Sequence, residues 1–123
     1  MKSAEHLNRF VREITYQVVR SLYDISVSGA GDREEIFISL CEKLVPITAG
    51  GLADNWSQVR FTASQACRSY FVFSKEKTAL REQFDDLMLP RMCLNRYYVA
   101  EGVRNYSIET WKLIAEDKGI ELV

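Results

Sequence analysis

A proline and a later Val-Arg pair recur together at a fixed distance along this 123-residue chain. Pro46 precedes Val59-Arg60 by the same interval that separates Pro90 from Val103-Arg104, and the two copies lie 44 residues apart. Periods of about 20–50 residues are typical of proteins that stack one supersecondary unit, each unit covering the apolar face of its neighbour. The repeat therefore predicts a stack of similar units.

Apolar residues recur at intervals of three and four throughout the chain, whereas the strict alternation of a half-buried strand is scarce. This spacing predicts an all-α fold of about five helices, at residues 5–23, 33–52, 55–73, 76–96 and 99–117. Pro46 and Pro90 fall within two of these segments, where proline kinks or ends a helix. The segment from Ser26 to Gly31 is predicted to be a loop.

The same spacing predicts which face of each helix is buried. In the first helix the predicted buried face comprises Leu7, Phe10, Val11, Ile14, Val18 and Leu22. In the third helix it comprises Val59, Ala63, Ala66, Tyr70 and Phe73. In the fifth it comprises Val103, Ser107, Thr110 and Ile114. Asp54 or Asn55 is predicted to cap the third helix, because short polar side chains satisfy the first free N–H groups.

Residues 54–66 read Asp-x-x-x-x-Val-Arg-x-x-Ala-x-x-Ala, the fixed positions being Asp54, Val59, Arg60, Ala63 and Ala66. The segment resembles the second helix of a HEAT repeat, a hairpin of helices A and B whose first helix often carries a proline. The copy at Val103-Arg104 departs from the pattern, with Tyr98 at the aspartate step and Ser107 and Thr110 at the alanine steps. Val11-Arg12 marks a third copy, with His6 at the aspartate step.

The resemblance implies an α-solenoid of stacked antiparallel helix pairs, similar to HEAT and armadillo proteins. Residues 1–123 would form one helical domain, with a lone helix at 5–23 and repeats at 33–73 and 76–117. Two interpretations stay open, since terminal repeats are atypical in either case. The chain is part of a longer solenoid, or it is a small domain whose end helices act as caps.

Two series of basic residues recur with the repeat. The first is Arg12, Arg60 and Arg104, for which we favour a structural role, because the family's arginine commonly pairs with an acidic group such as Asp54. The second is Arg20, Arg68 and Lys112. Helix B lines the concave surface in the family, so the resemblance implies a basic stripe that binds an acidic peptide or helix. A merely solvated face is an equally good interpretation of this second series.

Arg91 and Arg96 lie close to Tyr97 and Tyr98. Arginine and aromatic residues are enriched where proteins bind one another, and aromatic rings also stack on unpaired bases. We therefore include Arg91 and Arg96 among the candidate partner-binding residues. The alternative, which we favour for both tyrosines, is that they pack against Val103 and the next repeat.

Composition narrows the functional classes. The formal charge of −1 argues against attraction of the whole surface to nucleic acid or anionic membrane. Three cysteines without a Cys-x-x-Cys pair, and His6 as the sole histidine, argue against a metal site and for a reducing compartment such as the cytoplasm, the nucleus not being excluded. We found no catalytic motif and expect neither enzymatic activity, nor a cofactor, nor membrane binding.

These observations favour a protein-binding scaffold or adaptor of the HEAT-repeat type, whose partner has an acidic surface or peptide. A helical solenoid that binds nucleic acid is one alternative, motivated by the basic series and the tyrosines. A regulatory subunit of an enzyme complex is another. The sequence does not separate the first hypothesis from the third.

Overall fold

The computed structural model describes residues 8–28, 34–75 and 77–118, which form five α-helices and, within these ranges, no strand. The helices are α1 (Arg9–Ser28), α2 (Glu34–Gly51), α3 (Ser57–Ser74), α4 (Thr78–Asn95) and α5 (Glu101–Lys118). The all-α prediction is confirmed. Of the residues considered above, His6, Leu7 and residues 29–31 lie outside the described ranges.

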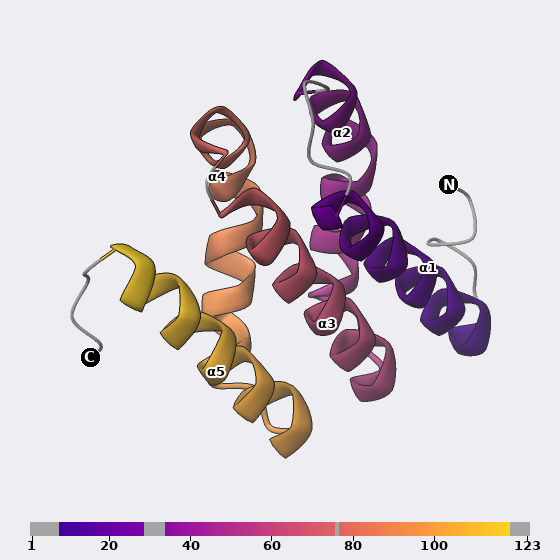
Figure 1. Ribbon diagram of the computed structural model, residues 1–123. Helices are drawn as coiled ribbons and strands as arrows, with labels where there is room; N and C mark the ends of the chain where they lie inside the picture. Colours follow the sequence, from indigo (N-terminus) through magenta and orange to yellow (C-terminus); the bar gives the residue numbers. More distant parts are fainter. Residues whose placement is uncertain (1–7, 29–33, 76, 119–123) are drawn as a thin grey trace.

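The helices are arranged in two layers. In Figure 1, α1, α3 and α5 lie side by side and run in similar directions, while α2 and α4 cross behind them. Contacts follow this arrangement, since α1 packs on α3, α3 on α5 and α2 on α4. Helix α3 lies at the centre and contacts all four other helices. The most repeat-like segment of the sequence is thus the segment around which the others pack.

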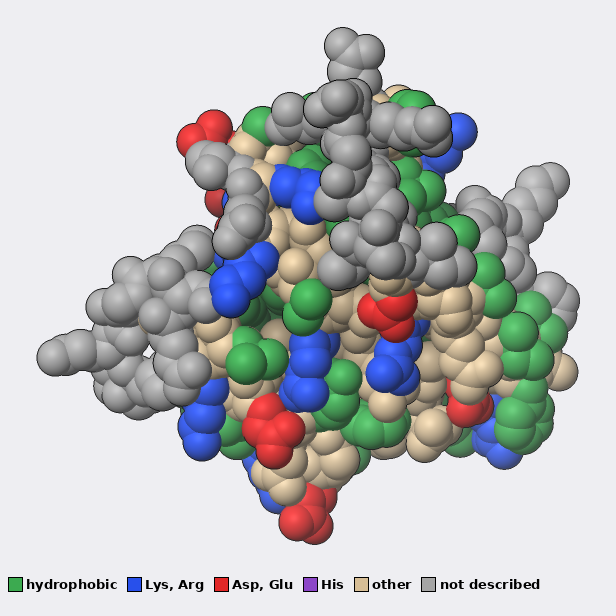
Figure 2. All heavy atoms as spheres, in the orientation of Figure 1, with side chains coloured by type: hydrophobic (Ala, Val, Ile, Leu, Met, Phe, Trp, Pro, Cys, Tyr) green, Lys and Arg blue, Asp and Glu red, His purple; other side chains and the backbone are tan. Residues whose placement is uncertain are grey.

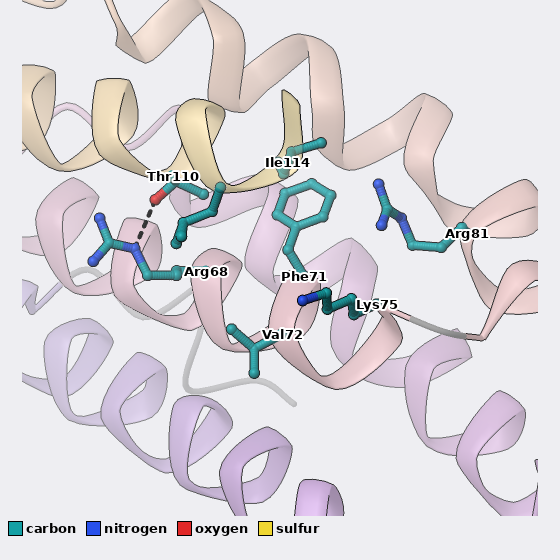
Figure 3. A pocket seen from close by; sticks show the side chains of 8 residues that line it. Arg68, Phe71, Val72, Lys75, Arg81, Thr110 and Ile114 are labelled. Carbon is teal, nitrogen blue, oxygen red and sulfur yellow. Dashed lines mark hydrogen bonds between the residues drawn. The ribbon is translucent and has the colours of Figure 1, made fainter. Parts of the chain in front are cut away.

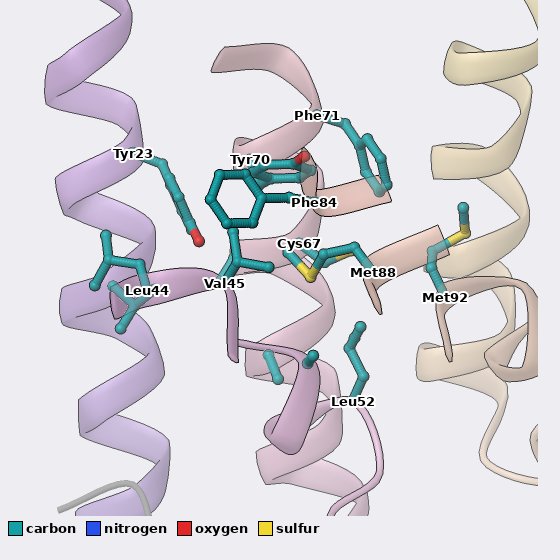
Figure 4. Close-up of a cluster of buried hydrophobic side chains, with 14 of the residues drawn as sticks. Tyr23, Leu44, Val45, Leu52, Cys67, Tyr70, Phe71, Phe84, Met88 and Met92 are labelled. Atoms are coloured by element: carbon teal, nitrogen blue, oxygen red, sulfur yellow. The ribbon is translucent and has the colours of Figure 1, made fainter. Parts of the chain in front are cut away.

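The core is continuous between the two layers. Figure 4 shows aromatic and aliphatic side chains from several helices meeting there, including Tyr23 of α1, Val45 of α2, Tyr70 of α3 and Met88 of α4. Tyr23 packs edge-on against Tyr70, with ring centroids 5.9 Å apart. Each of these large buried side chains contributes on the order of 2 kcal/mol through removal from water. The predicted buried faces of α3 and α5 are confirmed at every position.

The predicted buried face of α1 is wrong at three of its described positions, whereas Leu22 of that face packs against the core. Phe10, Ile14 and Val18 are 60%, 58% and 46% exposed, whereas Tyr16 and Val19 on the opposite side are buried. Both sides of this helix carry apolar residues at helical spacing, so periodicity alone favoured the more strongly apolar side. Packing of Tyr16 against α3 and the end of α2 selects the other side.

Two local features also differ from the sequence predictions. Helix α1 continues through Ser28, so the loop does not begin at Ser26. The residue before α3 is Trp56, with no side-chain cap, so neither Asp54 nor Asn55 is the cap. Instead Asp54 Oδ1 accepts a hydrogen bond from the Trp56 N–H at 3.0 Å and holds the turn before the helix. Pro46 and Pro90 lie inside α2 and α4, which continue past them, as the predicted segments 33–52 and 76–96 do.

Candidate functional site

The first series consists of Arg12, Arg60 and Arg104. Each of these arginines contacts a residue in the connection that precedes α3 or α5. Arg12 donates to Asp54 through Nε at 2.8 Å and through Nη2 at 3.1 Å, a two-point ion pair whose side chains are each only 12% exposed. Arg104 donates from Nη1 to the carbonyl of Tyr98 at 3.2 Å. These contacts fix the turns against the helices and leave little of Arg12 for a partner.

Arg60 is the residue equivalent to Arg12 in the next repeat, and it contacts an aromatic ring where Arg12 contacts a carboxylate. Its guanidinium lies 3.9 Å from the centre of the Tyr98 ring, and Tyr98 stands one repeat after Asp54. Arg60 Nη1 also donates to Asn95 Oδ1 at 2.9 Å, while Asn95 Nδ2 donates to the carbonyl of Leu52 at 3.0 Å. Asn95 is buried and connects three segments, a role that the sequence did not indicate. The ion pair of one repeat is thus replaced by a cation–π contact in the next.

The second series does not form a uniform row of accessible cations. Arg68 donates from Nε to Thr110 Oγ1 at 2.9 Å and from Nη2 to the carbonyl of Tyr106 at 2.8 Å, so it fastens α3 to α5. Arg20 is about half exposed and lies 3.8 Å from Asp24, an ion pair of small net stability. Lys112 is exposed. Arg20 and Lys112 therefore remain accessible, whereas Arg68 has a structural contact.

Arg91 and Arg96 also bind neighbouring backbone. Arg91 Nη1 donates to the carbonyl of Ala49 at 2.7 Å, which places a cation at the C-terminal end of α2, where it is favoured. Arg96 Nε donates to the carbonyl of Cys93 at 3.2 Å, and its guanidinium lies 5.1 Å from the Trp111 ring. Tyr97, by contrast, is 75% exposed. Of this group, Tyr97 is the side chain most accessible to a partner.

A cleft that the sequence did not predict lies between α3, α4 and α5. It has a volume of about 280 Å³ and is lined by Arg68, Phe71, Val72, Lys75, Arg81, Thr110, Leu113 and Ile114. Figure 3 shows these side chains converging from the three helices, with the Arg81 guanidinium directed toward Phe71 and Ile114. Of these residues, only Arg68 is among the candidate binding residues of the sequence analysis, and Thr110 and Ile114 belong to the predicted buried face of the fifth helix. The one available signal was that Val72 and Leu113 are apolar residues off the predicted buried faces.

The outward side of α1 is a second feature missed in the sequence. Phe10, Ile14 and Val18, here called the α1 stripe, follow one another at intervals of four and so share one side of the helix. Figure 2 shows apolar side chains along the edge of the molecule where α1 lies in Figure 1. Contiguous exposed apolar residues on a folded protein mark interaction sites more often than isolated ones do.

The cysteines behave as small apolar residues. Cys41, Cys67 and Cys93 are free thiols, and the first two are fully buried. Burial raises the pKa of Cys41 to about 12 and also raises the pKa of Cys67 and Cys93. Because the thiolate is the nucleophilic form, these side chains are poorly suited to covalent chemistry.

Two other classes of site can be assessed from the described residues. Within the described ranges, no three His, Cys, Asp or Glu side chains are grouped closely enough to hold a metal ion. None of the helices in these ranges has both the length and the apolar character needed to cross a membrane.

Comparison of the chain with family models, with curated proteins and with solved structures gives no match in any of the three.

Proposed function

We propose that this chain is a HEAT-like α-solenoid module, a right-handed stack of helix pairs, and that it binds a protein partner without catalysing a reaction. Two observations support the architecture. Front-layer helices α1, α3 and α5 lie side by side in sequence order, and α2 and α4 form a second layer. Arg12 at Asp54 and Arg60 at Tyr98 make corresponding contacts one repeat apart.

The observation that carries the binding proposal is the α1 stripe. Phe10, Ile14 and Val18 expose about half or more of their side-chain surface on one side of a helix whose other side is already packed. Exposed apolar groups of this size are unfavourable in water, and their burial by a partner contributes roughly 25 cal/mol per Å². A partner helix or sheet with an apolar face would gain this stabilisation.

The position of α1 supports this assignment. In the front layer α3 has a neighbour on both sides, whereas α1 contacts α3 and α2 and leaves its far side uncovered by the described residues. Ile14 and Val18 correspond by the repeat to Thr62 and Ala66, which are buried in the centre of the stack. At these two positions α1 therefore has large exposed side chains where α3 has small buried ones, as suits binding to a separate molecule.

Affinity capture with three baits tests this function. The baits are the wild-type chain, an Ile14→Gln/Val18→Gln variant, and a Leu87→Gln control that alters an exposed apolar residue on α4. We expect one protein to be enriched by the wild type and by the control and lost with the stripe variant. Circular dichroism first establishes that all three baits are equally helical.

Two results would contradict the proposal. Equal capture by all three baits would show that the α1 stripe is not the binding surface. Recovery of RNA or DNA in place of a protein, with an affinity that falls steeply as salt is raised, would favour the nucleic-acid alternative.

A further inference from the structure

The exposed side of α1 carries no charged residue over about three helical turns. Besides the α1 stripe, Gln17 and Ser21 are exposed on this side. Four of its residues follow one another at intervals of four, three and four, the spacing of a seam between two packed helices: Phe10, Ile14, Gln17 and Ser21. Figure 1 shows α1 at one end of the front layer, with α3 on one side only. Among the described residues, this side of α1 therefore has room for a further helix.

A row of charged residues, here called the charged flank, borders this side of α1 along the edge nearest α3. Its members are all at least partly exposed, and their signs alternate along the helix: Arg9, Glu13, Arg20 and Asp24. The Arg9 guanidinium lies 4.2 Å from the centre of the Trp56 ring. Glu13 accepts a hydrogen bond from Gln58 at 3.3 Å. Both contacts are at the surface, so these charges stay accessible to a partner.

The order of the four charges makes the charged flank complementary to itself. Arg9 and Asp24 are equally far from a point half a residue before Gln17, and so are Glu13 and Arg20. If a second α1 packs antiparallel about that point, Arg9 of each copy lies opposite Asp24 of the other. Glu13 of each copy then lies opposite Arg20 of the other. A parallel arrangement would instead bring each residue to the level of its own copy, like charge beside like charge.

We infer that the partner bound by the α1 stripe is a second copy of this chain, with the two α1 helices packed antiparallel about a two-fold axis beside Gln17. The apolar side chains of the two stripes then bury one another, with Ile14 close to Val18 of the second copy. The two Gln17 amides lie near the axis, where they can hydrogen-bond each other and fix the register. The inference rests on the proposed protein-binding function and names its partner.

The size of this contact sets the expected affinity. From Arg9 to Asp24 the helix is about 22 Å long, so one pair of such helices buries less than the roughly 1,600 Å² of a standard protein interface. Exposed ion pairs contribute little individually, although the two-fold symmetry forms each of them twice. We therefore expect a reversible dimer with a dissociation constant on the order of 10 µM.

Sedimentation equilibrium of the purified full chain tests the dimer and its geometry. Glu13→Lys and Arg20→Glu each reverse one charge of the charged flank. Glu82→Lys is the matched control, because it reverses an exposed charge on α4. The Ile14→Gln/Val18→Gln variant removes most of the α1 stripe. Circular dichroism first establishes that all variants are as helical as the wild type.

We expect the wild type and the Glu82→Lys control to dimerise with equal affinity, and the stripe variant to stay monomeric. Either reversal on the charged flank should weaken self-association about tenfold, because each dimer then has two like-charged contacts in place of two ion pairs. An equimolar mixture of Glu13→Lys and Arg20→Glu should associate about tenfold more tightly than either variant alone. In the mixed dimer both contacts again join opposite charges, which only the antiparallel arrangement provides.

Three outcomes would overturn the inference: a wild-type chain that is monomeric at about 200 µM, a stripe variant that dimerises like the wild type, or a mixture that associates no better than its components. Stripe-dependent capture of a different protein, together with a monomeric wild-type chain, would leave the proposed function standing and remove only this partner. Capture that does not depend on the stripe, together with a monomeric chain, would remove both.

Discussion

Gly51 occupies a point where three helices meet. A Cβ atom built on it would lie 2.6 Å from the Ala63 Cβ and closer still to the Tyr16 ring. Neither neighbour is free to move, because Ala63 is fixed to the α3 backbone and Tyr16 is buried. Gly50, one residue earlier in α2, has open space at the same position. A side chain at position 51 would therefore collide with its neighbours, whereas a side chain at position 50 would not.

We expect Gly51→Ala to lower the free energy of unfolding by about 1–3 kcal/mol, because the added methyl overpacks this junction. Gly50→Ala should raise it by about 0.5–1 kcal/mol, since alanine is the better helix former and meets no neighbour. Urea unfolding followed by circular dichroism measures both changes. A Gly51→Ala protein as stable as the wild type would show that α2 and α3 are not this close.

The Arg12–Asp54 pair gives a second expectation at this scale. Arg12→Met should cost about 2–3 kcal/mol, because it leaves a carboxylate without its charged partner in a site that is only 12% exposed. Asp54→Ala should cost a similar amount. In the double variant the two losses should not add, and the coupling free energy should exceed about 1 kcal/mol. Additive losses would mean that the ion pair contributes no stability of its own.

Helix α1 carries apolar residues on two sides, and only one of these sides is buried. Tyr16, Val19 and Tyr23 are buried on one side, and the α1 stripe is exposed on the other. Periodicity predicts a helix here correctly. It does not determine which of two apolar sides faces α3, since that depends on the fit of Tyr16 beside Gly51. In α5, where only one side carries a regular apolar and small-residue pattern, the predicted face is confirmed.

Two adjacent valines of α1 test this orientation. Val19→Ala should lower the free energy of unfolding by about 2 kcal/mol, because Val19 is completely buried. Val18→Ala should change it by less than about 0.5 kcal/mol, since Val18 is 46% exposed and alanine is the better helix former. Thermal or urea unfolding compares the two variants. The reverse order of effects would mean that α1 is rotated about its axis.

At the scale of the whole molecule, several tyrosines and thiols are buried among the described residues and are neutral at pH 7. Burial raises the pKa of Tyr16 and of Cys41 to about 12 each, and it also raises the pKa of Tyr23 and Tyr70. In the unfolded chain these groups ionise near their ordinary values of 10 and 9. Their folded and unfolded forms therefore differ in proton binding only at alkaline pH.

We expect the free energy of unfolding to be unaffected by these groups at pH 7–8 and to fall as pH rises from about 9 toward 12. Above their ordinary pKa values the unfolded state loses protons that the folded state retains, so ionisation favours unfolding. Urea titrations at pH 8 and pH 10 measure the change. A Tyr16→Phe variant should show a smaller fall over this interval. Stability that is constant or rises between these pH values would contradict the assigned burial.

The fold was more predictable than the candidate site, for a physical reason. Helix positions depend on local spacing, which the chain displays along its length, and the bounds of α3 and α4 fall within a few residues of the prediction. The cleft depends on how Phe71, Arg81 and Leu113 from three helices approach one another. Likewise the sequence marks Arg68 as accessible, whereas Thr110 and Tyr106 of α5 engage its guanidinium.

The central position of α3 has a consequence for how this chain unfolds. Arrays whose repeats contact only their nearest neighbours can lose terminal units one at a time. Here α3 contacts every other helix, so α2, α4 and α5 cannot detach without exposing part of its surface. Amide hydrogen exchange should accordingly be slowest and nearly uniform along α3, with opening free energies that equal the global value. Cooperative unfolding would then depend on the contacts of α3 with the other helices. A chain truncated immediately before or after α3 should not fold.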